Sequence, residues 1–274
     1  MEAREFKYKD RLFKVSGVLF ESVRYYEDTN FLCFVDIVNG LLYFQQDGCR
    51  LEKRSFPFLI GCVNRLTNDV LLLCTSIGVV RYSLFDESWS VEAVIPDNDV
   101  RFNDGVLDSD GNLWVGTMGY PDVIEGKGKL YFYDNKRLNW KSPLVVMESV
   151  TISNGLFVNL KKQELLYVDT PARTLTVNKI DSSIGLVKES RVLVDFKFRG
   201  LPDGICVDIN ENVWVAEWGS GVVSVWSPCG DLLSEWRLPE KNVTSVAVSR
   251  EHVYVTTAAG HGKECGYLYK SILK

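Results

Sequence analysis

The chain has 274 residues, of which 46% are hydrophobic and 24% are charged, the balance of a globular protein with enough apolar residues to form a core. Its formal net charge of −5, with no block of Lys or Arg, argues against nucleic-acid binding. No apolar run approaches the roughly 20 residues of a membrane-spanning helix, and the N-terminus lacks the apolar core of a signal peptide. Seven Cys residues are scattered without a C-x-x-C pair. This pattern predicts free thiols and a cytoplasmic location.

The first predicted element is a strand at 10–15, and it precedes a pattern that occurs six times. The repeated unit is a short strand of apolar, usually aromatic, and β-branched residues. Its centres are 38 to 53 residues apart, 44 on average. The six copies are CFV at 33–35, LLL at 71–73, LWV at 113–115, LYV at 166–168, VWV at 213–215 and VYV at 253–255.

Each copy has similar neighbours, which together predict a four-stranded unit. A polar turn precedes the copy, and a second strand follows it, usually after a Gly. A further strand closes the unit, and the clearest of these outer strands are predicted at 91–95, 144–147, 191–194 and 232–238.

The period selects one architecture, because a four-stranded propeller blade needs about 40 to 50 residues. The sequence therefore predicts an all-β fold, a single six-bladed β-propeller domain over 1–274. The last copy supplies only three strands before the sequence ends. We expect the strand at 10–15 to add the fourth and so to close the last blade.

Polar residues recur where the innermost strand of each predicted blade begins. In a propeller these positions converge at one end of the central channel. One Asn-Gly or Asp-Gly pair alone is more typical of a turn than of a ligand site, but recurrence at one register in several blades favours a shared site. The residues concerned are Glu21, Asn103, Asp104, Asn154 and Asp203.

Carboxylate and amide oxygens at these positions suit a hard divalent cation such as Ca²⁺, Mg²⁺ or Mn²⁺. A zinc site built from histidines is excluded, because the only two, His252 and His261, both lie in the last copy. We therefore expect one divalent cation at the mouth of the central channel, with its identity open among Ca²⁺, Mg²⁺, Mn²⁺ and Zn²⁺.

Seven short motifs, taken in order, resemble the gluconolactonase/regucalcin (senescence marker protein) family, which also contains luciferin-regenerating enzyme. The resemblance extends from about residue 17 to 258, nearly the whole chain. The motifs are RFNDG at 101–105, LWVGTM at 113–118, SNGL at 153–156, YVDTP at 167–171, GLPDG at 200–204, NVWVA at 212–216 and VTS at 243–245.

The resemblance implies a propeller lactonase with one divalent cation. It places the metal ligands on Glu21, Asn154 and Asp203, and the substrate-binding pair on Arg101 and Asn103. Asp203 is also the residue that we expect to relay a proton from water during catalysis.

Two segments depart from the family pattern. The family usually has Gly-Glu-Gly-Pro around its first-blade ligand, whereas this chain has Phe-Glu-Ser-Val at 20–23. The family often places an acidic substrate-binding residue soon after Gly-Thr-Met. Here the sequence is GYPDVIE at 119–125, so either Asp122 or Glu125 fills that role or the contact is lost.

The expected function is a metal-dependent hydrolase that opens a small, sugar-type lactone. Two alternatives stay open: a non-catalytic cation-binding or scaffold propeller, and a related esterase or organophosphate hydrolase. The expected partner is the small-molecule lactone, with no nucleic acid and no membrane, and the protein is expected to be a monomer or a homodimer.

Overall fold

The computed structural model describes residues 3–135, 143–260 and 265–273. The described chain is built from strands, with two single-turn 3₁₀ helices, η1 (Tyr8–Asp10) and η2 (Thr170–Ala172). No helix among these residues is long and apolar enough to span a membrane. The chain forms two compact units, residues 58–195 and residues 1–57 with 196–274.

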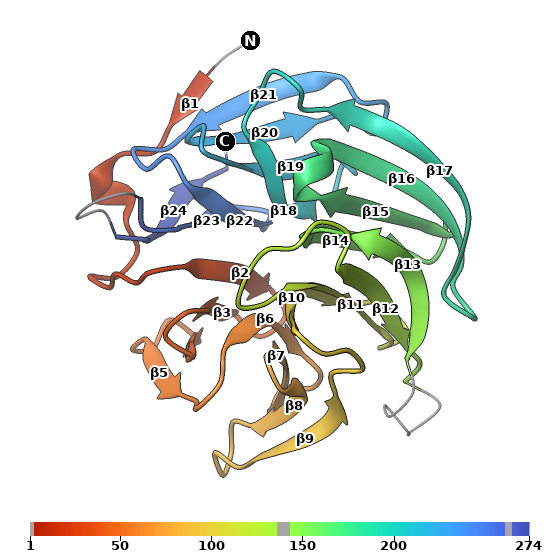
Figure 1. Cartoon of the computed structure of the whole chain (residues 1–274). Coiled ribbons are helices and arrows are strands. Elements are labelled where there is room, and N and C mark those ends of the chain that lie inside the picture. The colour runs from red at the N-terminus through yellow and green to blue at the C-terminus, as the bar shows by residue number, and fades with distance from the viewer. Residues whose placement is uncertain (1–2, 136–142, 261–264, 274) are drawn as a thin grey trace. The chain divides into compact units, whose positions relative to one another are not determined.

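The unit at 58–195 contains three antiparallel sheets, each made of four strands that are consecutive along the chain (Figure 1). Each sheet begins with a strand that lies beside the first strand of the next sheet, in the order β6, β10, β14. The strands are β6 (Ile60–Arg65), β7 (Val70–Thr75), β8 (Gly78–Ser83) and β9 (Trp89–Val94); β10 (Val100–Leu107), β11 (Leu113–Gly119), β12 (Gly128–Tyr133) and β13 (Leu144–Val150); β14 (Ser153–Asn159), β15 (Glu164–Asp169), β16 (Thr174–Asp181) and β17 (Leu186–Asp195).

The other unit also has three sheets of consecutive strands, and their first strands lie side by side in the order β18, β22, β2. Its strands are β2 (Phe20–Tyr26), β3 (Phe31–Asp36), β4 (Leu41–Gln46) and β5 (Glu52–Ser55); β18 (Leu201–Val207), β19 (Val213–Trp218), β20 (Val222–Trp226) and β21 (Leu232–Arg237), with β1 (Ala3–Glu5) added; and β22 (Val243–Val248), β23 (His252–Thr257) and β24 (Leu268–Ile272).

All six predicted repeats are therefore sheets, and each predicted outer strand overlaps an observed fourth strand. The aromatic centres of the repeats pack between neighbouring sheets of one unit. Trp114 and Tyr167 lie in one cluster between the β10–β13 and β14–β17 sheets, and Trp214 and Tyr254 lie in two clusters of the other unit. These aromatic residues are buried in the core. Burial of such large apolar surfaces is a main source of stability.

In the N-terminal segment, residues 10–15 do not form the strand that the sequence predicted. Residues 10–15 lie along β24, where Arg11 bridges Tyr269 and the Leu12 amide donates to the Leu268 carbonyl. They form one isolated bridge and not a strand, because Phe13 has a φ of 62°, in the left-handed region that interrupts an extended ladder. The last sheet therefore keeps three strands, and the N-terminal strand β1 pairs in parallel with β21.

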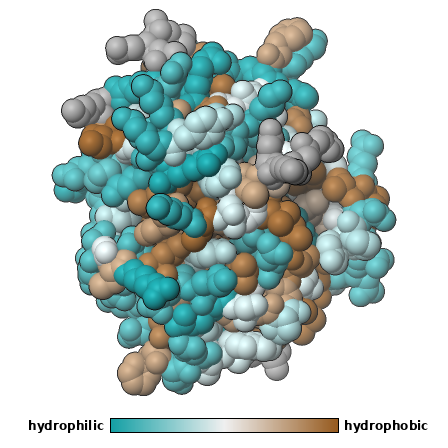
Figure 2. Space-filling view, turned by 90° about the vertical axis from the view of Figure 1, so that its left-hand side faces the viewer, coloured by the Kyte–Doolittle hydropathy of each residue, from teal (hydrophilic) through white to brown (hydrophobic). Residues whose placement is uncertain are grey.

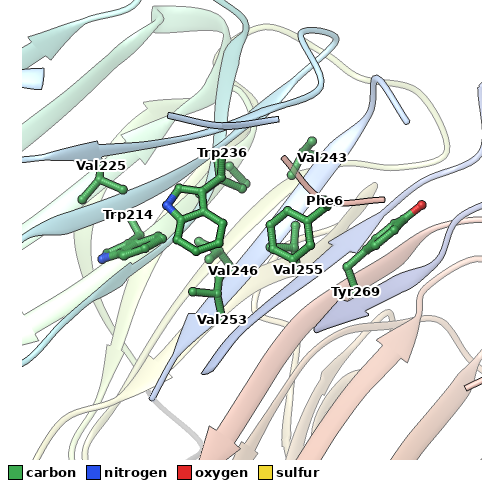
Figure 3. Packing of buried hydrophobic residues seen from close by; sticks show 11 residues of the cluster. Phe6, Trp214, Val225, Trp236, Val243, Val246, Val253, Val255 and Tyr269 are labelled. Carbon is green, nitrogen blue, oxygen red and sulfur yellow. The ribbon is translucent and has the colours of Figure 1, made fainter. Parts of the chain in front are cut away.

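The same segment is fastened by its side chains. Phe6 is buried between the rings of Trp236 and Tyr269, with centroid distances of 5.5 and 5.8 Å (Figure 3). Arg11 forms an ion pair of 2.5 Å with the buried Glu240 and donates to the Tyr269 hydroxyl. The N-terminal segment thus joins the edges of two sheets within its unit.

Candidate functional site

All six first strands share one irregularity that the sequence did not reveal. Near its start, each strand shifts register against its neighbour, so that one or two of its residues are left out of the ladder. Such bulges re-aim side chains, and they are common next to active sites. The shifts lie between Glu21 and Arg24, Ile60 and Cys62, Phe102 and Gly105, Asn154 and Leu156, Pro202 and Ile205, and Val243 and Ser245.

The predicted substrate-binding pair lies at the bulge of β10. Arg101 and Asn103 are both more than nine-tenths buried. The Arg101 Nη1 atom donates to Asn103 Oδ1 at 2.7 Å and to the Phe102 carbonyl at 3.0 Å. Because a buried guanidinium must have acceptors, this short contact holds the two side chains as one unit. The structure does bring this predicted pair together.

Asn103 connects this pair to the predicted ligand Asn154 on β14. Its amide nitrogen donates to Asn154 Oδ1 at 2.7 Å and to the Ser153 carbonyl at 2.9 Å. The Asn154 nitrogen in turn donates to the Thr170 hydroxyl at 2.7 Å. Asn154 therefore has its amide nitrogen directed at η2 and its amide oxygen directed at Asn103.

Thr170 is a site residue that the sequence analysis missed, although it lies within the YVDTP motif. It begins η2, directly after Asp169, whose carboxylate accepts the amides of Thr151 and Ile152 at 3.2 and 3.0 Å. Burial raises the pKa of Asp169, and these two hydrogen bonds only partly offset that effect. Asp169 thus ties the end of β15 to the segment that leads into Asn154.

Gly116 of the LWVGTM motif makes room for the strand that carries Asn154. A Cβ atom at Gly116 would lie 1.7 Å from Ser153 Oγ and 2.1 Å from Ser153 Cβ. No side chain can be accommodated there without moving Ser153, the residue next to Asn154. The glycine in this motif therefore has a packing role close to the site.

Gly116→Ala is expected to lower the free energy of unfolding by about 2 to 3 kcal/mol, because the added methyl group overpacks the contact between β11 and β14. Urea denaturation measures the change. The double variant Gly116→Ala/Ser153→Gly removes the colliding atoms and is expected to recover at least half of the loss. A Gly116→Ala variant that is as stable as the wild type would show that Ser153 on β14 can move away from β11 at no cost in stability.

The other unit carries the two predicted carboxylate ligands. Glu21, on β2, is half-buried, and its Oε2 accepts the amide of Ser22 at 3.1 Å. Ser22 has a φ of 52°, in the left-handed region that favours glycine, the residue that the family usually has there. The departure from the family pattern around Glu21 is thus accommodated by a serine in the left-handed conformation.

Asp203, on β18, is only 5% exposed, and like Asn103 it is one of the residues that the bulge leaves out of the ladder. The predicted donors are all oxygen atoms and include two carboxylates, which is a set that fits a hard divalent cation. Among the described residues, no three of the types His, Cys, Asp and Glu form a group that could hold a metal. The predicted ligand set of Glu21, Asn154 and Asp203 contains only two residues of these types. That the three side chains meet at one metal ion stays a prediction.

A separate open pocket of about 350 Å³ lies in the same unit as Asp203. Its charged side chains pair with one another: Arg199 lies 2.7 Å from both Glu217 and Glu235, and Arg237 lies 3.1 Å from Glu235. Burial lowers the pKa of Arg199, but its hydrogen bonds to the two glutamates outweigh burial and raise it. Glu217 is buried, with only 1% of its surface exposed.

Comparison with known proteins identifies the family. The family described as SMP-30/gluconolactonase/LRE-like region matches residues 19–259. The chain belongs to this family. The pentonolactonase XacC of Haloferax volcanii is 33% identical over 259 residues, which cover 92% of this chain and 86% of that protein.

Two solved structures show the fold. A calcium-binding protein, regucalcin, from Agrobacterium tumefaciens has a TM-score of 0.87 at 19% identity, covering 98% of this chain and 95% of that one. Luciferin-regenerating enzyme has a TM-score of 0.85 at 22% identity, covering 94% and 92%. The predicted six-bladed β-propeller is confirmed, and so is the family resemblance read from the motifs.

Proposed function

We propose that the protein is a divalent-metal-dependent lactonase that opens a small, sugar-type lactone. The observation that carries the proposal is the buried chain of hydrogen bonds from Arg101 through Asn103 to Asn154. These residues lie at strand starts where the family motifs predict the site. The naming of a relative as a pentonolactonase supports the same reaction class.

In this proposal Glu21, Asn154 and Asp203 hold one divalent cation at the mouth of the central channel. When bound, the cation supplies a Lewis acid that stabilises negative charge on the lactone carbonyl oxygen. The hydrogen bonds of Asn154 to Asn103 and Thr170 orient its amide group for this role. Its amide oxygen retains a second lone pair for the cation.

The remaining steps belong to the residues of the chain. Asp203 accepts a proton from the attacking water, whose oxygen adds to the carbonyl carbon, and the proton passes to the ring oxygen when the ring C–O bond breaks. The product is one hydroxy acid. Arg101 and Asn103 orient the substrate oxygens, since a planar guanidinium presents several donors in fixed directions.

A pH-indicator assay with a panel of aldonolactones tests the proposal. The chelated protein is compared with protein reconstituted in turn with Ca²⁺, Mg²⁺, Mn²⁺ and Zn²⁺. We expect turnover that is lost on chelation and restored by at least one cation. Cation binding without turnover of any ester would indicate a non-catalytic propeller, and turnover of aryl or phosphate esters alone would indicate the esterase alternative.

A further inference from the structure

A short loop after β11 displays apolar side chains that the fold does not bury. We call the segment GYPDVIE, which begins at the last residue of β11 and leads toward β12, the 119–125 loop. Tyr120, Val123 and Ile124 are 41%, 55% and 48% exposed. Single exposed apolar residues are common on protein surfaces. On the face shown in Figure 2, small groups of hydrophobic residues lie among hydrophilic ones. Three in one loop need a specific explanation.

The loop is attached at both ends to the segments that lead into the site strands. The Tyr120 amide donates to the Asp99 carbonyl at 2.9 Å, and Asp99 is two residues before Arg101. The Gly126 amide donates to the Thr151 hydroxyl at 3.1 Å, and Thr151 is three residues before Asn154. Met118, just before the loop, pairs directly with Arg101. The 119–125 loop therefore lies at the same end of these two sheets as the Arg101, Asn103 and Asn154 side chains.

The loop is also held in one shape. It folds closely over Gly119, where a Cβ atom would lie 2.5 Å from the Asp122 carbonyl oxygen. The Lys127 amide donates to the Ile124 carbonyl at 3.2 Å, and Lys127 and Lys129 both form ion pairs with Asp97. The apolar side chains are thus presented by a defined turn, and their display is a property of the fold.

Small-molecule sites combine mostly apolar walls with a few placed polar groups. The 119–125 loop has exposed apolar side chains at the same end of these sheets as the polar cluster, so it is placed to supply such a wall. We propose that Tyr120, Val123 and Ile124 contact an apolar substituent on the lactone ring, so that the substrate is a lactone with an alkyl or deoxy end. This inference rests on the proposed function. In this inference the apolar residues of the loop determine the substrate specificity. Asp122 and Glu125, which are exposed on the same turn, are not required for substrate binding.

A series of γ-lactones with methyl, ethyl, propyl and butyl tails tests the inference by kcat/KM. For the metal-loaded wild type we expect a rise of about twofold to fourfold for each methylene group that the wall covers. The double variant Val123→Asn/Ile124→Asn is expected to reduce this rise to less than about 1.5-fold for each methylene group. The matched control is Val94→Asn/Val192→Asn, which replaces two exposed valines on outer strands of the same unit.

Binding of the corresponding γ-lactams, which resist hydrolysis, is measured by calorimetry as a second readout. We expect the same dependence on tail length in the wild type and its loss in the double variant. Aldonolactone turnover with no dependence on tail length would overturn the inference and leave the proposed function standing. If no lactone were turned over, the proposed function would fail, and lactam binding without a dependence on tail length would then overturn the inference as well.

Discussion

Asp203→Asn is expected to lower kcat/KM for lactone hydrolysis by about 10³-fold, with most of the loss in kcat. Asparagine has nearly the same size, so the buried position on β18 stays filled. The substitution removes a negative charge and, in the proposed mechanism, the group that accepts the proton from water. It also replaces a proposed carboxylate ligand by a weaker amide, so we expect lower cation affinity in calorimetry with Ca²⁺ and Mn²⁺.

Asp231→Asn is the matched control, because Asp231 is an exposed aspartate at a turn of the same unit. Its activity and cation affinity should equal those of the wild type. Full turnover by a folded Asp203→Asn variant would remove Asp203 from the mechanism. Loss of activity with unchanged cation affinity would separate the two roles, since Asp203 would then act on the proton and not on the metal.

The strands could be predicted because their pattern is local. The residues at 113–115 and 213–215 are the short continuous apolar runs typical of a buried strand, and a polar turn precedes each of them. The regular spacing of these strand patterns along the chain then predicted the number of sheets. The common register of Trp114 and Trp214 in their copies is explained by their packing between sheets.

The register shifts could not be predicted, because a bulge depends on the pairing of two strands and leaves no pattern in either one. Asn103 and Asp203 were selected as polar residues before a Gly, but their exclusion from the ladder appears only in the structure. Thr170 was missed for a similar reason, since its hydroxyl contacts a side chain 16 residues away. For the segment at 10–15 the error was local: Leu-Phe-Lys-Val looks like a strand, but Phe13 is in the left-handed conformation.

One repeated motif has a role that its composition hides. Asp108, Asp110 and Asn112 alternate along the turn before Trp114 and resemble a calcium-binding loop. The Asp108 carboxylate, however, accepts four hydrogen bonds of 2.9 to 3.0 Å, from the amides of Asp110 and Asn112, the Asn112 side chain and Trp114 Nε1. A carboxylate that already has four donors closes the turn and anchors the indole ring. It is structural.

Asp108→Ala is therefore expected to lower the free energy of unfolding by about 3 to 5 kcal/mol, measured by urea denaturation. The substitution leaves the Nε1 group of Trp114 and the Asn112 side chain, both buried, without their acceptor. Trp114→Phe removes the indole donor, so a double-mutant cycle of the two substitutions should show a coupling energy of about 1 kcal/mol or more.

The second copy of the motif, around Asp208, shows how the stability cost should depend on burial of the carboxylate. Asp208 makes the same four hydrogen bonds in the other unit, including one of 3.0 Å to Trp214 Nε1, but it is partly exposed. Water can replace part of its contacts, so we expect Asp208→Ala to lower the free energy of unfolding by about 1 to 3 kcal/mol.

Asp110→Ala, at an exposed position in the first copy, should have a free energy of unfolding within about 0.5 kcal/mol of the wild type. If Asp110→Ala were as costly as Asp108→Ala, the turn and not the buried carboxylate would carry the stability. Added Ca²⁺ should change none of these values, because the Asp108 and Asp208 oxygens are already occupied by donors.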